Sequence, residues 1–105
     1  MSDKATQANQ ANKENITVSK ELTIINKLGL HARAASKLAQ LCQKFSSKIT
    51  LSLDKKEADA SSIMAIMLLA GAQGKTVKVT AQGVDAYDAL QAISQLIGDK
   101  FDEEE

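Results

Sequence analysis

The chain has 105 residues, of which 44% are hydrophobic and 25% charged, so it is long enough for one hydrophobic core and too short for two. Its 13 basic and 13 acidic side chains give a formal net charge of zero, which argues against a general binder of nucleic acid or anionic lipid. The longest strongly apolar run, residues 63–70, is far shorter than the roughly 20 residues of a membrane span, and the N-terminus has no signal-peptide core, which predicts a cytosolic protein without membrane insertion.

Residues 1–15 are rich in Gln, Asn, Ala, Ser and Lys and are predicted to form a disordered polar tail, because they offer too little apolar surface to bury. Apolar and polar residues then alternate from Ile16 to Ile25, which predicts a strand whose firm part is Leu22 to Ile25. A turn at residues 26–29 follows. The next apolar residues are spaced as on one face of a helix from Ala32 to Phe45.

The second half of the chain shows the same two periodicities. Residues 49–53 alternate and are followed by turn residues 54–56 and a short strand at 57–60, which predicts a hairpin. The apolar segment 63–70 is predicted to form a short helix that Gly71 and Gly74 end. A strand at 76–82 and a helix at 86–97 come next, and the acidic residues 99–105 are predicted to fray.

The order strand, helix, strand, strand, helix, strand, helix predicts an α+β fold. Strands joined by hairpins, with helices between them, indicate a two-layer open-faced sandwich in which three helices cover one face of a four-stranded antiparallel sheet. The domain is predicted to span residues 16–101, between the polar tail at 1–15 and an acidic tail at 102–105.

The one histidine of the chain, His31, and its one arginine, Arg33, stand two residues apart where the predicted turn enters the first helix. Unpaired N–H groups and the positive dipole end favour anions there and disfavour imidazolium, so His31 is expected to be neutral near pH 7 with a nucleophilic nitrogen. The planar fork of Arg33 suits phosphate oxygens. The alternative interpretation is an ordinary surface or capping histidine beside a solvated arginine.

The other candidate residues favour structural roles. Cys42 falls on the apolar face of the first helix and is expected to be buried, and one cysteine with one histidine does not suffice for a structural metal site, so neither metal nor cofactor is predicted. Ser62 suits a helix N-cap first and a regulated hydroxyl second. A helix of two turns cannot bury all of Ile63, Met64, Met67 and Leu68, and some of them are predicted to form an exposed docking patch.

Three segments of the chain resemble the HPr family of phosphocarriers of the bacterial phosphotransferase system. They are residues 24–35 (IINKLGLHARAA), residues 60–67 (ASSIMAIM) and the pair Gln73-Gly74, in the order and at the separations of that family. The resemblance covers about Glu21 to Phe101. It implies a stoichiometric carrier rather than an enzyme, which takes a phosphoryl group from an enzyme I-type donor charged with phosphoenolpyruvate and passes it to a histidine of an enzyme IIA-type acceptor.

The resemblance also implies roles for individual residues. His31 matches the phosphorylated histidine, Arg33 the arginine that orients the phosphate, and Ser62 the serine that an HPr kinase/phosphorylase modifies in some branches. Donor and acceptor must both reach His31, so a monomeric carrier is expected to meet them with one surface, formed by Leu30, Ala32, Ile63, Met64 and Met67. The family usually has proline after the arginine. Here Ala34 is expected to cost some preorganisation of the first turn but no catalytic group.

Other functions remain open from the residues alone. One is an anion-binding or small-ligand regulatory module of the same fold class, which predicts no acid-labile phosphoprotein. Another is an RNA-binding sandwich, which the zero net charge and the lack of aromatic residues in the strands at 22–25 and 76–82 disfavour. Within the resemblance, the sequence does not separate the sugar branch from the nitrogen-related branch.

Overall fold

The computed structural model describes residues 16–103. The predicted polar tail at 1–15 and the last two residues of the predicted acidic tail lie outside the described residues. The elements are, in chain order, β1 (Thr17–Thr23), α2 (Ala32–Cys42), β2 (Lys48–Leu53), β3 (Lys56–Asp59), α3 (Ile63–Leu68), β4 (Thr76–Gln82), α4 (Ala86–Gly98) and the short turn η1 (Lys100–Asp102). Within this part of the chain, none of the helices has both the length and the apolar character needed to cross a membrane.

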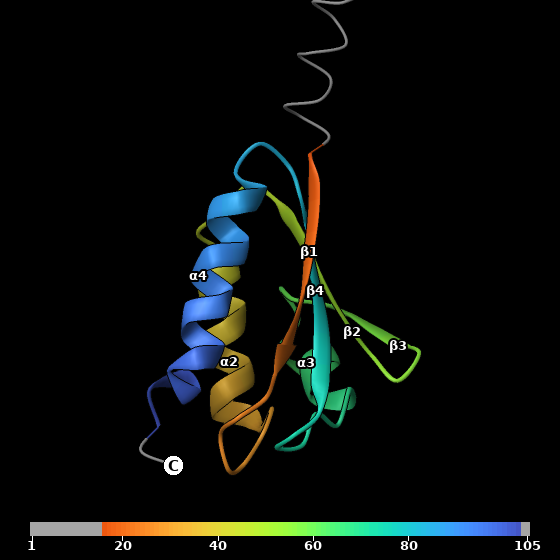
Figure 1. Cartoon of the computed structure of the whole chain (residues 1–105), viewed down its shortest axis with the longest axis vertical. Coiled ribbons are helices and arrows are strands. Elements are labelled where there is room, and N and C mark those ends of the chain that lie inside the picture. The colour runs from red at the N-terminus through yellow and green to blue at the C-terminus, as the bar shows by residue number, and fades with distance from the viewer. Residues whose placement is uncertain (1–15, 104–105) are drawn as a thin grey trace, which may run out of the picture.

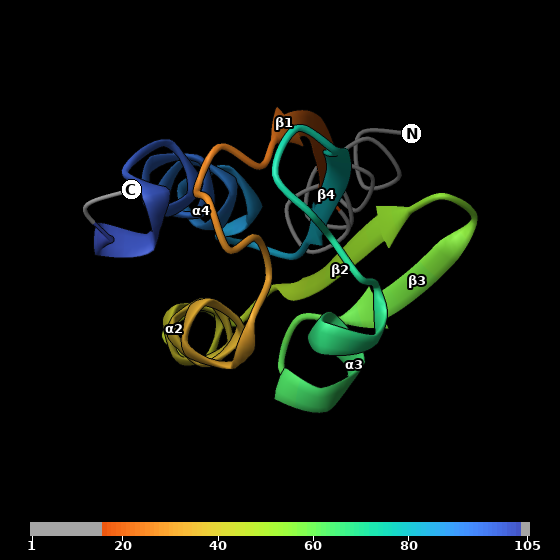
Figure 2. The same cartoon turned by 90° about the horizontal axis from the view of Figure 1, so that it is seen from below.

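The strands form one four-stranded antiparallel sheet in the order β1-β4-β2-β3. In its centre, Val79 of β4 lies opposite Lys20 of β1 and Leu51 of β2. The hairpin between β2 and β3 turns at Asp54 and Lys55, which both have positive φ. The helices α2, α3 and α4 lie on one face of this sheet (Figures 1 and 2). The predicted open-faced α+β sandwich is confirmed.

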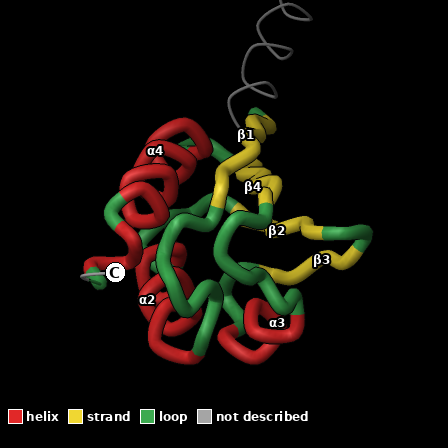
Figure 3. Tube along the Cα trace, turned by 60° about the horizontal axis from the view of Figure 1, so that its bottom comes forward, coloured by secondary structure: helices red, strands yellow, loops and turns green. Residues whose placement is uncertain are grey.

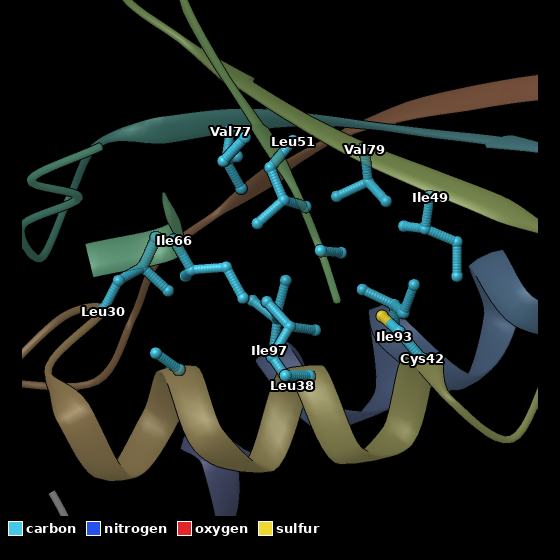
Figure 4. Close-up of a cluster of buried hydrophobic side chains, with 14 of the residues drawn as sticks. Leu30, Leu38, Cys42, Ile49, Leu51, Ile66, Val77, Val79, Ile93 and Ile97 are labelled. Atoms are coloured by element: carbon cyan, nitrogen blue, oxygen red, sulfur yellow. The ribbon is translucent and has the colours of Figure 1, made fainter. Parts of the chain in front are cut away.

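The core lies between the sheet and the helices (Figure 4). Because side chains alternate across a strand, every second residue of β2 and β4 points inward and is buried. The labelled side chains from the strands are Ile49, Leu51, Val77 and Val79, and those from the helices include Leu38, Cys42, Ile66, Ile93 and Ile97. Burial raises the pKa of the Cys42 thiol to about 12, with a further contribution from the charge of Asp59, so this thiol is inert.

Several predicted boundaries are wrong: the short helix predicted at 63–70 ends at Leu68, the strand predicted at 57–60 is Lys56–Asp59, and two other elements differ as follows. The regular strand is Thr17–Thr23, and Ile24, which the alternation placed in its firm part, lies beyond it in a buried loop. This residue still pairs with the chain after α3, because its N–H donates to the Lys75 carbonyl (2.9 Å) and its carbonyl accepts from Gly74 N–H (2.7 Å). Helix α2 ends at Cys42, and the N–H of Phe45 bonds the Cys42 carbonyl in a tighter turn.

Gly29 fixes the turn that leads to His31. Its φ is +66°, and a Cβ here would lie 2.2 Å from the carbonyl oxygen of Gly71, which the N–H of Leu30 also bonds at 2.8 Å. We expect Gly29→Ala to lower the free energy of unfolding by about 2 kcal/mol or more, from left-handed strain and displacement of the facing backbone.

The control for this prediction is Gly98→Ala at the end of α4, where nothing lies within 4 Å of the added Cβ. Alanine is expected there to be neutral or to stabilise by up to about 1 kcal/mol, through helix propensity. Urea denaturation followed by circular dichroism measures both variants. Equal midpoints for the two would contradict the argument.

Candidate functional site

His31 stands at the N-cap of α2 with extended backbone (φ −74°, ψ 178°). Its carbonyl accepts the N–H of Ala35 at 2.8 Å, so the first helical bond forms, while its side chain makes no capping bond. The first turn of α2 contains no acidic residue. The backbone N–H groups at this end therefore keep their preference for an anion, and the half-buried ring, with a side-chain exposure of 27%, stays accessible.

Arg33 follows in the same first turn and is exposed. Its guanidinium makes no hydrogen bond or ion pair with any other residue between 16 and 103, so the whole fork is available to a ligand. Ala32, between the two, is exposed and too small to shield either side chain, and the buried Ala34 underlies the turn. An open hollow surrounds these groups. It is lined by Leu28, His31, Ala32, Arg33, Lys37, Asp102 and Glu103.

Glu103 is a site residue that the sequence analysis did not identify. Its Oε2 lies 2.5 Å from His31 Nε2, and its Oε1 accepts from Asn26 Nδ2 at 3.2 Å. Burial acts to raise the pKa of Glu103, but the hydrogen bonds from His31 and Asn26 outweigh it and hold the pKa below its ordinary value. The group is thus a carboxylate, which can only accept a hydrogen bond, so Nε2 is the donor in this contact and Nδ1 lies outside it.

The turn that delivers Glu103 shows that the prediction of fraying is wrong for residues 99–103, while the last two residues of that prediction lie outside the described residues. Lys100, Phe101 and Asp102 have φ of 57°, 56° and 62°, a left-handed conformation that costs about 1–2 kcal/mol for each non-glycine residue. Two contacts fix it: Phe101 is fully buried, and Lys37 Nζ donates to its carbonyl at 2.8 Å. A lone aromatic residue among acidic ones was the one sequence signal for this anchor.

The predicted docking residues divide into an exposed set and one exception. Ile63, Met64 and Met67 are 41%, 75% and 43% exposed, so α3 presents the predicted apolar surface. Leu30 is the exception. At 6% exposure it packs into the core beneath Gly71, because the bond from its N–H to the Gly71 carbonyl turns its side chain inward, so it supports this surface without presenting itself to a partner.

The loop before α2 lies beside the loop that follows α3 (Figure 3), and a second open hollow runs between them. It is lined by Leu28, Leu30, His31, Met67, Ala70, Gly71 and Ala72. Leu28, which is 65% exposed, was not predicted, and it extends the apolar surface of α3 up to the histidine. We call the exposed residues Leu28, Ile63, Met64, Met67 and Leu68 the apolar patch.

Ser62 is the N-cap of α3, as predicted, and its hydroxyl accepts from the N–H of Ala65 at 3.1 Å. Its side chain is partly exposed at the edge of the apolar patch. Between residues 16 and 103, no cluster of three or more His, Cys, Asp or Glu side chains is arranged to hold a metal ion.

Comparison with known proteins agrees with this arrangement. The family model described as the PTS HPr component phosphorylation site matches residues 18–99. The phosphocarrier protein HPr of Xylella fastidiosa (strain Temecula1) is 50% identical over 84 residues, which cover 80% of this chain and 94% of that protein. The phosphocarrier protein NPr of Shewanella violacea is 46% identical over 84 residues, covering 80% and 92%. The crystal structure of HPr from Thermoanaerobacter tengcongensis superimposes with a TM-score of 0.80 at 44% identity, covering 84% of this chain and 99% of that one.

Proposed function

The chain belongs to the HPr family of phosphotransferase-system phosphocarriers, and from this premise we propose that His31 is the residue that carries the phosphoryl group. One observation carries the proposal: the single histidine of the chain stands at a helix N-terminus beside an arginine that is unpaired among residues 16–103, and its Nδ1 lies outside the contact with Glu103. Such a site offers a nucleophile and a receptor for phosphate oxygens together.

In the proposed reaction, Nδ1 of His31 attacks the phosphorus in line with the bond to the donor. The new P–Nδ1 bond forms as the donor's bond breaks, and the electron pair of that bond remains with the donor. The loose transition state spreads charge over three oxygens, which the Arg33 fork and the first-turn N–H groups of α2 stabilise. A single arginine at an exposed site binds the group weakly enough for the reverse chemistry to release it to the acceptor.

Donor and acceptor meet the carrier on one surface in this proposal. The donor is an enzyme I-type protein charged with phosphoenolpyruvate, and the acceptor is an enzyme IIA-type protein. The carrier acts as a monomer and transfers one phosphoryl group per molecule in each cycle. Both partners must reach His31, and the adjoining apolar patch offers the contact area. Phosphorylation of Ser62 by an HPr kinase/phosphorylase would place negative charge at this surface and inhibit docking more than folding.

Intact-mass spectrometry after incubation with phosphoenolpyruvate and an enzyme I-type protein tests the proposal. The expected result is one added phosphoryl group, lost in acid and stable at mildly alkaline pH, with slower charging of Arg33→Ala. No added mass, under conditions where the donor charges an established carrier, would reject the phosphohistidine proposal for that donor. It would favour the non-covalent anion-binding module, which the family does not support.

Met64 tests the proposed docking role of the apolar patch. We expect Met64→Asp to lower the rate of phosphoryl acceptance at subsaturating carrier about tenfold, because an exposed apolar contact becomes a charge that the interface must desolvate. The control is Tyr87→Asp, which changes a side chain of similar exposure (67%) at the start of α4. Quenched-flow measurement of the initial rates of phosphoryl acceptance compares the two variants. Equal rates would show that the apolar patch does not contact the donor.

A further inference from the structure

We propose that Glu103 is a positioning residue for phosphoryl transfer, holding the Nε2 proton of His31 so that Nδ1 is the nucleophile and the ring can bear positive charge. The inference rests on the proposed function of His31. It starts from the contact between Glu103 Oε2 and His31 Nε2, at 2.5 Å, which joins residues 72 positions apart in the chain. Nothing local in the sequence brings these two side chains together.

The Glu103 carboxylate is held on both sides. Its second oxygen accepts from Nδ2 of Asn26, which is fully buried and also donates to the Gly29 carbonyl at 2.8 Å. Asn26 thereby links the carboxylate to the same turn that positions His31. This orientation leaves the Oδ1 of Asn26 buried without a hydrogen-bond partner among the described residues. A buried polar atom is left unpaired so that both amide hydrogens are used at the site.

Besides the unpaired Asn26 oxygen, the strained backbone just before Glu103 is a second unfavourable contribution to the free energy of folding beside the His31 ring. The three left-handed residues, Lys100 to Asp102, are kept in that conformation by the burial of Phe101 and by the bond from Lys37 to its carbonyl. The N–H of Glu103 bonds the Lys100 carbonyl at 3.0 Å, which closes the turn. Strained backbone persists where surrounding contacts over-determine it, and such places are enriched at functional sites. Here the strained turn aims one carboxylate at the reactive ring.

The Glu103 carboxylate can stabilise the positive charge that the His31 ring acquires when it is phosphorylated. When the Nδ1 lone pair bonds phosphorus, a ring protonated at Nε2 becomes a phosphoimidazolium with one positive charge, and the adjacent carboxylate stabilises that charge. On transfer to the acceptor, the P–Nδ1 bond breaks, its electron pair returns to the ring, and the product is neutral imidazole still protonated at Nε2. Loss of that proton would instead require an imidazolate leaving group. Carboxylate–histidine pairs in hydrolases fix tautomer and charge in the same way.

The opposite role, an inhibitory latch, makes the opposite prediction. If Glu103 mainly obstructed access to His31, removing its charge would speed charging. The geometry argues for positioning, because Glu103 contacts Nε2 and leaves the lone pair of Nδ1 without that contact. Lys37, beside the carboxylate, also moderates its repulsion of the phosphoryl oxygens.

The test compares Glu103→Gln with Glu57→Gln, which makes the same chemical change at an exposed glutamate of β3, outside the site. In Glu103→Gln we expect the maximal rate of phosphoryl acceptance to fall about tenfold at an unchanged half-saturating carrier concentration, as for loss of an interaction made in the transition state. Glu57→Gln is expected to match the wild type. ¹⁵N NMR of the His31 ring should show protonation at Nε2 in the wild type and a mixture of neutral tautomers in Glu103→Gln.

Each outcome of this test decides the inference. A fall in maximal rate together with the mixed tautomer supports it, and Glu103→Asp should restore part of the rate if a carboxylate is what matters. Unchanged rate, faster charging, or an unchanged tautomer in Glu103→Gln would overturn it. Failure of the wild-type chain to gain an acid-labile phosphoryl group would reject the proposed function itself, so the two failures are distinguishable.

Discussion

Replacing His31 with alanine is expected to abolish phosphoryl acceptance completely, with no added mass after prolonged incubation with phosphoenolpyruvate and an enzyme I-type donor. The reason is chemical: the chain has no second histidine, and the thiol of Cys42 is buried in the core with a raised pKa. Ser62 does not substitute, because its hydroxyl has no general base among its hydrogen-bond partners. The loss should therefore be total and not a reduction in rate.

The fold of His31→Ala is expected to survive, since the imidazole makes no capping bond and remains partly exposed. Circular dichroism and urea denaturation check this. The matched control is Gln91→Ala on the exposed face of α4, which should charge like the wild type. A phosphoryl group that still appears on a folded His31→Ala chain would show that another residue is the acceptor.

The elements predicted correctly are those in which local pattern and tertiary burial agree. The strand at 76–82 alternates without a break because β4 is central and has one face against the core, so its observed bounds match. The polar residues at 54–56 correctly predicted a hairpin turn, which the structure has at Asp54 and Lys55. Pattern failed at Ile24, because an apolar residue in a buried loop looks the same in sequence as one in a strand.

The site was predictable only where it is local. His31 and Arg33 share one helix start, so their spacing indicated an anion site. Glu103 completes the site from the far end of the chain, where Asn26 of the turn before His31 holds it, and it follows a left-handed turn that residues other than glycine rarely adopt. No rule based on propensity places such a turn. Leu30 illustrates the converse, since its position next to His31 suggested exposure while the backbone bond to Gly71 turns it inward.

Phe101→Ala is expected to lower the free energy of unfolding by about 3–5 kcal/mol, the usual cost of deleting a fully buried phenylalanine. Phe101 is the largest of the fully buried side chains, and its turn contacts both α4 and α2. Urea denaturation at low temperature measures the loss. Tyr87→Ala is the control, because this aromatic residue is 67% exposed and its removal is expected to change stability by about 0.5 kcal/mol or less.

Phe101→Ala also tests whether the buried ring keeps Glu103 in contact with His31. Without the Phe101 ring, only the bond from Lys37 to the carbonyl of residue 101 opposes the left-handed strain of residues 100–102, so Glu103 should leave Nε2 of His31 even in molecules that remain folded. Folded Phe101→Ala is therefore expected to show the mixed tautomer and the slow charging of Glu103→Gln. A folded Phe101→Ala chain that keeps Nε2 protonated would show that Asn26 and the Lys37 bond hold the carboxylate in place without the ring. A loss of stability no larger than that of Tyr87→Ala would show that the turn is not anchored by this ring.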